Sequence, residues 1–168
     1  MRLSRRSGPP QDEAARSTAA QVICKIAGVD LPEKAWGELI PTLQANMQQP
    51  QVGLKRSTLD TLGFVCEEIS SEVLEQAQVN VLLTAIVQGM RKEEADNGIR
   101  LSATKALYNA LDFASENFKN EFERNYIMQV VCEGTLCTDV KARPAAPAVP
   151  PSAPSFLTAR DEPGSILF

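Results

Sequence analysis

Helical segments that begin with a basic residue recur in this chain about every forty residues. They start at Arg16, Lys55, Arg100 and Arg143, at spacings of 39, 45 and 43 residues. Such an interval is typical of solenoid proteins in which each repeat is a pair of helices. A repeat of this kind buries its apolar residues only against its neighbours and leaves an extended surface. The period therefore favours a protein that binds other macromolecules over one with a closed catalytic pocket.

The apolar pattern predicts an all-α fold, an α-solenoid of about three helix pairs of the HEAT or armadillo kind. We expect helices over residues 12–27, 33–47, 54–69, 79–91, 99–113 and 121–136, with a further partner helix due near Val140. Residues 1–11 are predicted to be a disordered leader and residues 12–140 the solenoid. Residues 141–168 are predicted to be a disordered Pro-rich tail, because the six prolines from Pro144 to Pro163 cannot continue a helix.

Two of the predicted helices have unusual features near the start of the chain. The first is expected to end at Gly28 and to bury one stripe along its length, made of Ala15, Ala19, Val22, Ile23 and Ile26. In the second, Pro41 falls inside the predicted range. An interior proline removes a hydrogen bond and kinks a helix at a cost of about 3 kcal/mol, so we expect a bent helix there.

The helix predicted over residues 79–91 is apolar almost all round. Leu82, Ile86 and Met90 form one line along it, and Leu83 with Val87 forms a second line about 100° away. A helix with this surplus of apolar residues is either deeply buried or presents an outward binding surface. The sequence leaves both possibilities open.

Composition excludes several classes of function. A net charge of −4 and a pI near 5.0 argue against a general nucleic-acid binder. The chain has no histidine, which removes the commonest general base and most mixed zinc sites. No segment approaches the run of about 18 apolar residues that a membrane span requires. We therefore expect no enzyme, no cofactor, no metal, and neither nucleic acid nor membrane as a partner.

The four cysteines indicate packing rather than chemistry. Cys24, Cys66, Cys132 and Cys137 contain no CxxC pair, and each lies within or just after an apolar helical run. A free cysteine in such a position behaves as a small apolar residue. We expect buried thiols in a reducing compartment.

Five stretches carry a resemblance to a known family: WGELIPTLQANM, STLDTLGFVCEEI, LTAIVQGMRKEE, LSATKALYNALDF and ERNYIMQVVCEGT. They closely resemble the importin-β family of nuclear transport receptors, also called the karyopherin-β family, over about Arg16 to Val140. The resemblance implies a truncated fragment of the N-terminal HEAT repeats. It would hold the second helix of the third repeat, all of the fourth and fifth, and the first helix of the sixth.

The resemblance implies a receptor that imports basic cargo through nuclear pores, moves between cytoplasm and nucleus, and releases cargo through Ran in its GTP-bound form. In this family, nucleoporins insert the phenylalanine of a Phe-Gly repeat between the first helices of adjacent repeats. Carried over residue by residue, one wall of that groove would be Leu83, Thr84 and Val87, and the other would be Glu123, Tyr126 and Ile127. The family usually has phenylalanine at the position of Tyr126, so the added hydroxyl is expected to lower affinity slightly.

The resemblance also implies Ran, and importin-α or basic cargo, as partners. Ran contact in the family begins at the first repeats, and cargo contact lies mostly beyond the matched stretch. Two other interpretations stay open at this point. The six groove residues could pack repeat against repeat and bind nothing, and the chain could be a generic HEAT scaffold without a transport role.

Overall fold

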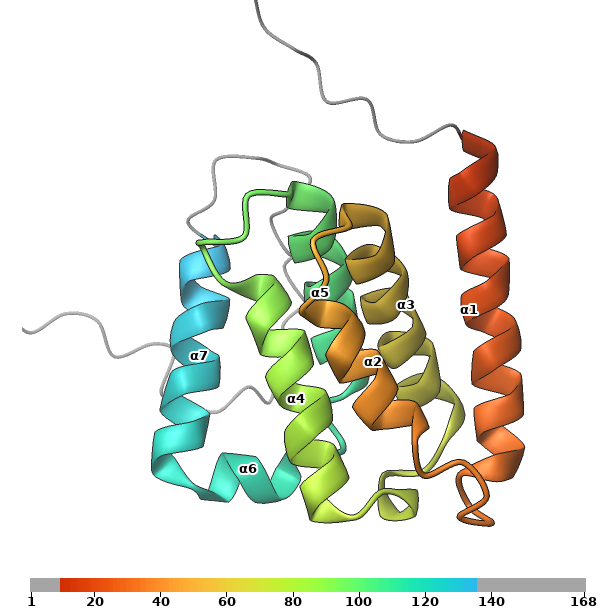
Figure 1. Ribbon diagram of the computed structural model, residues 1–168. Helices are drawn as coiled ribbons and strands as arrows, with labels where there is room; N and C mark the ends of the chain where they lie inside the picture. Colours follow the sequence, from red (N-terminus) through yellow and green to blue (C-terminus); the bar gives the residue numbers. More distant parts are fainter. Residues whose placement is uncertain (1–9, 136–168) are drawn as a thin grey trace, which may run out of the picture.

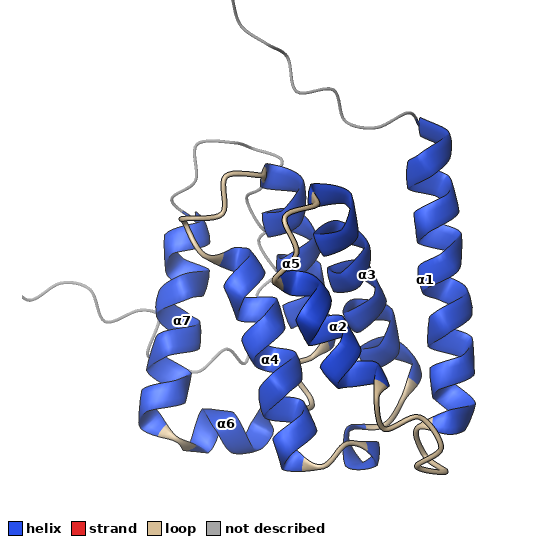
Figure 2. Ribbon diagram, in the orientation of Figure 1, coloured by secondary structure: helices blue, strands red, loops and turns tan. Residues whose placement is uncertain are grey.

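A computed structural model of the chain describes residues 10–135 and, within them, contains helices but no strand (Figures 1 and 2). The helices are α1 Pro10–Asp30, α2 Leu39–Met47, α3 Val52–Glu68, α4 Gln76–Met90, α5 Asn97–Asn109, α6 Ser115–Lys119 and α7 Glu121–Thr135. A single 3-10 turn, Ser71–Val73, precedes α4. The all-α prediction is confirmed.

Three features of the predicted organisation lie outside the described residues. They are the leader up to residue 9, the helix expected near Val140 and the Pro-rich tail over 141–168. Residues 10 and 11, which we assigned to the leader, instead belong to α1.

The helices form two layers. In one layer α1, α3 and α5 lie side by side, and in the other α2, α4 and α7 lie side by side (Figure 1). Helices α2 and α3 make one complete pair and α4 and α5 make the next, while α1 and α7 flank these pairs as single helices. The predicted solenoid is therefore confirmed as two complete pairs with half a pair on either side.

The core lies between the two layers. Its most deeply buried side chains include Leu59 and Leu62 on α3, Leu82 and Ile86 on α4, and Ile99 on α5. Helix α4 packs against α2, α3, α5 and α7, so neighbours surround most of its circumference. This explains why its sequence is apolar almost all round.

The bend expected at Pro41 is not needed, because α2 begins later than predicted. The helix begins at Leu39 rather than near residue 33, so Pro41 is its third residue. Backbone N–H groups in the first turn have no acceptor within the helix, and a proline there costs nothing. The chain between α1 and α2 is a turn instead, in which Lys34 has a φ of 56° and the Ala35 N–H donates to the Asp30 carbonyl oxygen at 2.8 Å.

The stripe predicted on α1 was wrong. The side of α1 that packs on α3 carries Ala20, Cys24 and Ala27, which are buried. Of the predicted stripe, Ile23 alone is partly buried, and the exposed members are Ala15, Ala19, Val22 and Ile26. Helix α1 also continues past Gly28 to Asp30. The helix has two apolar sides, and its described neighbours cover one of them.

The cysteine prediction is confirmed in part. Cys24 and Cys66 are buried free thiols, whereas Cys132 on α7 is exposed, and Cys137 lies outside the described residues. In the part of the chain that the structure describes, no helix combines the length and the apolar character needed to cross a membrane. The same part holds no group of three or more metal-ligating side chains.

Candidate functional site

A groove of about 420 Å³ runs between α4 and α7. All six residues proposed from the sequence line it: Leu83, Thr84, Val87, Glu123, Tyr126 and Ile127. Helices α4 and α7 are neighbours in the same layer, as the groove prediction required. Residues about forty positions apart in the sequence are therefore brought to one place by the stacking of repeats.

The two helices that form the groove begin in similar ways. At the start of α4, the Glu75 N–H donates to Gln78 Oε1 at 3.1 Å in a capping box. At the start of α7, Asn120 Oδ1 accepts from the Phe122 N–H at 3.0 Å. Both side-chain caps satisfy backbone groups that the first turn leaves free, and they fix where each helix starts.

The six residues divide into a floor and a rim. Leu83, Val87 and Ile127 are at most 5% exposed, so they form an apolar floor where α4 packs on α7. Thr84 and Glu123 are exposed and Tyr126 is 50% exposed, so these three form the rim. Packing of one repeat on the next therefore accounts for the floor, and it leaves the three rim side chains exposed to solvent.

A cluster of hydrogen-bonded polar side chains lines the groove near the start of α4. The buried Asn117 of α6 donates through Nδ2 to Asn80 Oδ1 at 2.8 Å and to Glu123 Oε2 at 2.6 Å. Its Oδ1 accepts from Gln76 Nε2 at 3.0 Å. Asn120 Nδ2 donates to the other Glu123 oxygen at 2.9 Å. The amides hold the Glu123 carboxylate in place beside the apolar floor.

The opposite end of the groove is lined by Gln88 and Arg91. Gln88 accepts from Gln48 Nε2 at 3.2 Å, and Arg91 Nε lies 3.3 Å from Glu93 Oε2. Both side chains are thus tied to neighbours at the edge of the groove. An apolar floor between two polar ends suits an aromatic side chain carried on a peptide whose backbone needs hydrogen-bond partners.

The sequence-based prediction missed the polar lining. Asn80 and Gln88 lie on the same face of α4 as Thr84, four residues to either side, so helical spacing could have identified them. Asn117 gave no comparable signal. It lies on α6, a five-residue helix that the apolar pattern did not predict.

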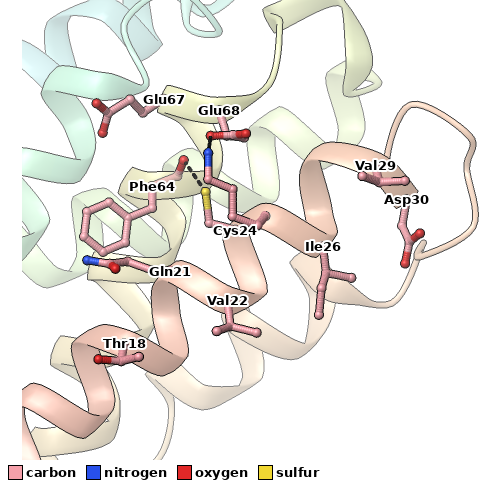
Figure 3. A pocket seen from close by; sticks show the side chains of 11 residues that line it. Thr18, Gln21, Val22, Cys24, Ile26, Val29, Asp30, Phe64, Glu67 and Glu68 are labelled. Atoms are coloured by element: carbon pink, nitrogen blue, oxygen red, sulfur yellow. Dashed lines mark hydrogen bonds and ion pairs between the residues drawn. The ribbon is translucent and has the colours of Figure 1, made fainter.

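A larger hollow, about 980 Å³, lies along α1, and none of the six predicted groove residues lines it (Figure 3). Phe64 and Glu68 of α3 line it together with Val22, Cys24 and Lys25 of α1. Lys25 Nζ lies 2.6 Å from Glu68 Oε2, and this hydrogen bond raises the pKa of the Lys25 ammonium. The Cys24 thiol donates to the Phe64 carbonyl oxygen at 3.1 Å, and burial raises its pKa. The hollow is larger than the α4–α7 groove, but none of the six residues proposed from the sequence lines it.

Comparison with known proteins places the chain beside nuclear transport receptors. Importin subunit beta-1 of Arabidopsis thaliana is 56% identical over 131 residues, which are 78% of this chain and 15% of that protein. No protein-family model matches the sequence. The chain therefore spans about 15% of the length of this relative.

Solved structures agree with that match. Kap95, yeast importin-β, in the Kap95:Nup1 complex is 41% identical, with a TM-score of 0.66 over 75% of this chain and 15% of that chain. A structure in which Kap95p binding induces the switch loops of RanGDP to adopt the GTP-bound conformation is 38% identical, with a TM-score of 0.70 and the same coverage. The arrangement of helices seen here is thus also found in a section of these longer solenoids.

Proposed function

Since the chain belongs to the importin-β family, we propose that its α4–α7 groove binds Phe-Gly repeats of nucleoporins and that it acts in protein import into the nucleus. The observation that carries this proposal is that the six residues named from the family resemblance all line one groove. Helix packing explains the buried floor. It does not explain an aromatic rim residue, Tyr126, left half exposed above that floor.

The groove suits a weak contact with one phenylalanine. Covering a Phe ring contributes about 1.5–3 kcal/mol, and the cost of association leaves an affinity of roughly millimolar strength. A transport receptor must leave each repeat quickly, so weak single contacts serve it well. Many such contacts in series raise the overall affinity without slowing each exchange.

Two of the related structures name partners of Kap95. Kap95 is known in a complex with Nup1 and in one with Ran. We extend both kinds of partner to this chain, together with importin-α or basic cargo and a location in cytoplasm, nucleus and nuclear pore. The function proposed is that of a binding protein and not of an enzyme.

The test is a titration of a fluorescently labelled Phe-Gly repeat peptide, followed by anisotropy. Tyr126→Ala should lower affinity about fivefold or more, because it removes the ring from the rim. Tyr108→Ala is the matched control, since Tyr108 is the chain's other tyrosine, is exposed, and lies on α5 outside the groove. Substituting Asp for Leu83 or Ile127 is a poorer test, because an unpaired carboxylate in the packed floor would also destabilise the fold.

Two outcomes contradict the proposal. One is equal loss of binding in the Tyr126 and Tyr108 variants, and the other is no saturable binding at millimolar peptide. The second outcome would leave the generic HEAT scaffold as the better description.

A further inference from the structure

The α4–α7 groove carries hydrogen-bonding groups that the packing of its own helices does not use. Asn80 lies on the α4 wall and Glu123 on the α7 wall, and both side chains are exposed. Neighbouring amide nitrogens hold each of them in one orientation, through hydrogen bonds of between 2.6 and 2.9 Å. The groups that stay open on these two side chains therefore indicate what kind of ligand the groove recognises.

The Glu123 carboxylate can accept further hydrogen bonds. Its Oε2 accepts from Asn117 Nδ2 at 2.6 Å, and its Oε1 accepts from Asn120 Nδ2 at 2.9 Å. A carboxylate oxygen accepts two hydrogen bonds, so one acceptor position stays open on each oxygen. Among residues 10–135, no Lys or Arg side chain forms an ion pair with Glu123. Because no described cation neutralises this charge, an N–H group is a favourable ligand for it.

Asn80 offers the complementary group, a hydrogen-bond donor. Its Oδ1 accepts from Gln76 Nε2 at 2.9 Å and from Asn117 Nδ2 at 2.8 Å. These two bonds use both acceptor positions of the amide oxygen and fix which way the planar amide is turned. Asn80 Nδ2, by contrast, donates to no atom of the part of the chain that the structure describes. A carbonyl oxygen of a ligand would be a suitable acceptor for it.

Asn117 sets the distance between these two groups. Its Nδ2 is bonded to Asn80 Oδ1 and to Glu123 Oε2 at the same time, so one amide nitrogen spans the two walls of the groove. Asn117 itself is 6% exposed and lies on α6, outside both wall helices. The gap that it fixes is narrow enough for a single peptide unit to meet both side chains, because the N–H and C=O of a trans peptide unit point in opposite directions.

The two groups lie next to the apolar floor where the phenylalanine ring is proposed to bind. Asn80 comes four residues before Thr84 on α4, and Glu123 comes four residues before Ile127 on α7. Four residues are about one helical turn, which advances about 5.4 Å along the axis. That offset is shorter than two residues of an extended peptide, at about 3.3 Å each. The peptide unit within reach is therefore one that adjoins the phenylalanine.

We propose that Asn80 and Glu123 clamp the peptide unit between the phenylalanine and the glycine of a bound Phe-Gly repeat. The Glu123 carboxylate accepts from the glycine N–H, and Asn80 Nδ2 donates to the phenylalanine carbonyl oxygen. Asn117 is a positioning residue, because it holds both side chains. A glycine suits this place, since it has no side chain to keep the backbone away from the two walls. The inference rests on the proposed function and names the backbone groups that the groove recognises.

A peptide that lacks one N–H group tests the clamp. In an ester analogue, glycolic acid replaces the glycine, so an ester oxygen stands where the N–H was and the phenylalanine ring is unchanged. NMR titrations of the full chain, up to about 10 mM peptide, compare the amide and the ester. They are run on the unsubstituted chain and on Glu123→Ala, Asn117→Ala and Glu121→Ala. The last is the matched control, since Glu121 is an exposed glutamate in the first turn of α7 that does not line the groove.

The ratio of the two affinities reports the hydrogen bond. The ester should bind the unsubstituted chain and Glu121→Ala about fivefold or more weakly than the amide does. On Glu123→Ala the two peptides should differ by about twofold at most, because the acceptor is gone. Asn117→Ala should reduce the ratio in the same way. A substitution that only loosened the fold would weaken both peptides equally and leave the ratio unchanged.

Failure of the clamp differs from failure of the proposed function. An equally large ester effect on Glu123→Ala overturns the clamp and leaves the proposed function standing. Equal binding of amide and ester by the unsubstituted chain has the same meaning. If neither peptide binds, or if Tyr126→Ala leaves binding of the amide unchanged, the proposed function fails and the clamp fails with it.

Discussion

Gly63 on α3 and Ala106 on α5 meet without a side chain between their backbones: a β-carbon on Gly63 would lie 3.2 Å from Ala106 Cα. The close approach lets Asn109 Nδ2 donate to the Gly63 carbonyl oxygen at 3.1 Å. The distance between two successive repeats is therefore set in part by the absence of a side chain at Gly63.

Replacing Gly63 by leucine should lower the free energy of unfolding by about 2 kcal/mol or more, because the new side chain forces α3 and α5 apart. Urea denaturation followed by circular dichroism measures the change. Gly37→Leu serves as the control, since nothing lies within 4 Å of a β-carbon there. Equal destabilisation by both substitutions would show that the α3–α5 approach is not the cause.

Asn117→Asp should destabilise the α6–α7 end of the chain at neutral pH. The substitution places a second carboxylate next to Glu123, whose Oε2 now accepts from Asn117 Nδ2 at 2.6 Å. Repulsion raises the pKa of the new carboxyl above its unfolded value of about 4. The stability difference from the unsubstituted chain should therefore be smallest below about pH 4 and should grow as pH rises through the raised pKa.

Chemical denaturation of both chains at several pH values measures that difference. Asn125→Asp, at an exposed site on the same helix as Glu123, should show almost no pH-dependent difference. A constant difference for Asn117→Asp across the range would mean that lost hydrogen bonds, and not repulsion, dominate.

The thiols should differ widely in reactivity. Burial raises the pKa of the Cys66 thiol to about 12, whereas Cys132 is exposed. Because the thiolate is the reactive form, iodoacetamide at about pH 8 should label Cys132 quickly and Cys66 only when the fold opens. Peptide mapping by mass spectrometry separates the sites. Labelling of Cys66 as fast as Cys132 in the folded chain would contradict the packing described for α3.

Burial of Cys66 also predicts how stability depends on alkaline pH. The folded pKa is raised above the ordinary value of 9.0, so in the unfolded state this thiol ionises first. Its contribution is fully present below about pH 9 and is lost by about 1.4 kcal/mol per pH unit as pH rises towards 12. The stability of Cys66→Val should fall less steeply over that range when both chains are unfolded in urea. Parallel curves would rule out the linkage.

The sequence predicted the stacking of helix pairs correctly, but it did not predict which side of α1 is buried or where α2 begins. The roughly forty-residue period predicted the solenoid because each pair must bury its apolar residues on the next pair. On α1, however, apolar residues lie on two sides, and periodicity alone could not show that Cys24 and Ala27, and not Val22 and Ile26, meet α3. Pro41 misled the helix prediction because the apolar pattern does not mark where the first turn begins.

The sequence predicted six residues that line the groove, but it predicted neither which of them are buried nor the contribution of Asn117. Its six predicted residues came from family resemblance, supported by the second apolar line of Leu83 and Val87 on α4. The division into floor and rim depends on how closely α7 packs on α4, which no single helix encodes. Asn117 could not be found at all, because a five-residue helix has too few turns to produce a periodic signal.

The most direct test of the account is an NMR titration of the isotope-labelled chain with a Phe-Gly repeat peptide. We expect the backbone signals that shift in a saturable way to cluster at Thr84 and Val87 on α4 and at Glu123, Tyr126 and Ile127 on α7. Signals along the α1–α3 hollow, from Val22 to Glu68, should stay in place. Shifts confined to that hollow, or none at millimolar peptide, would contradict the assignment of the α4–α7 groove as the binding site.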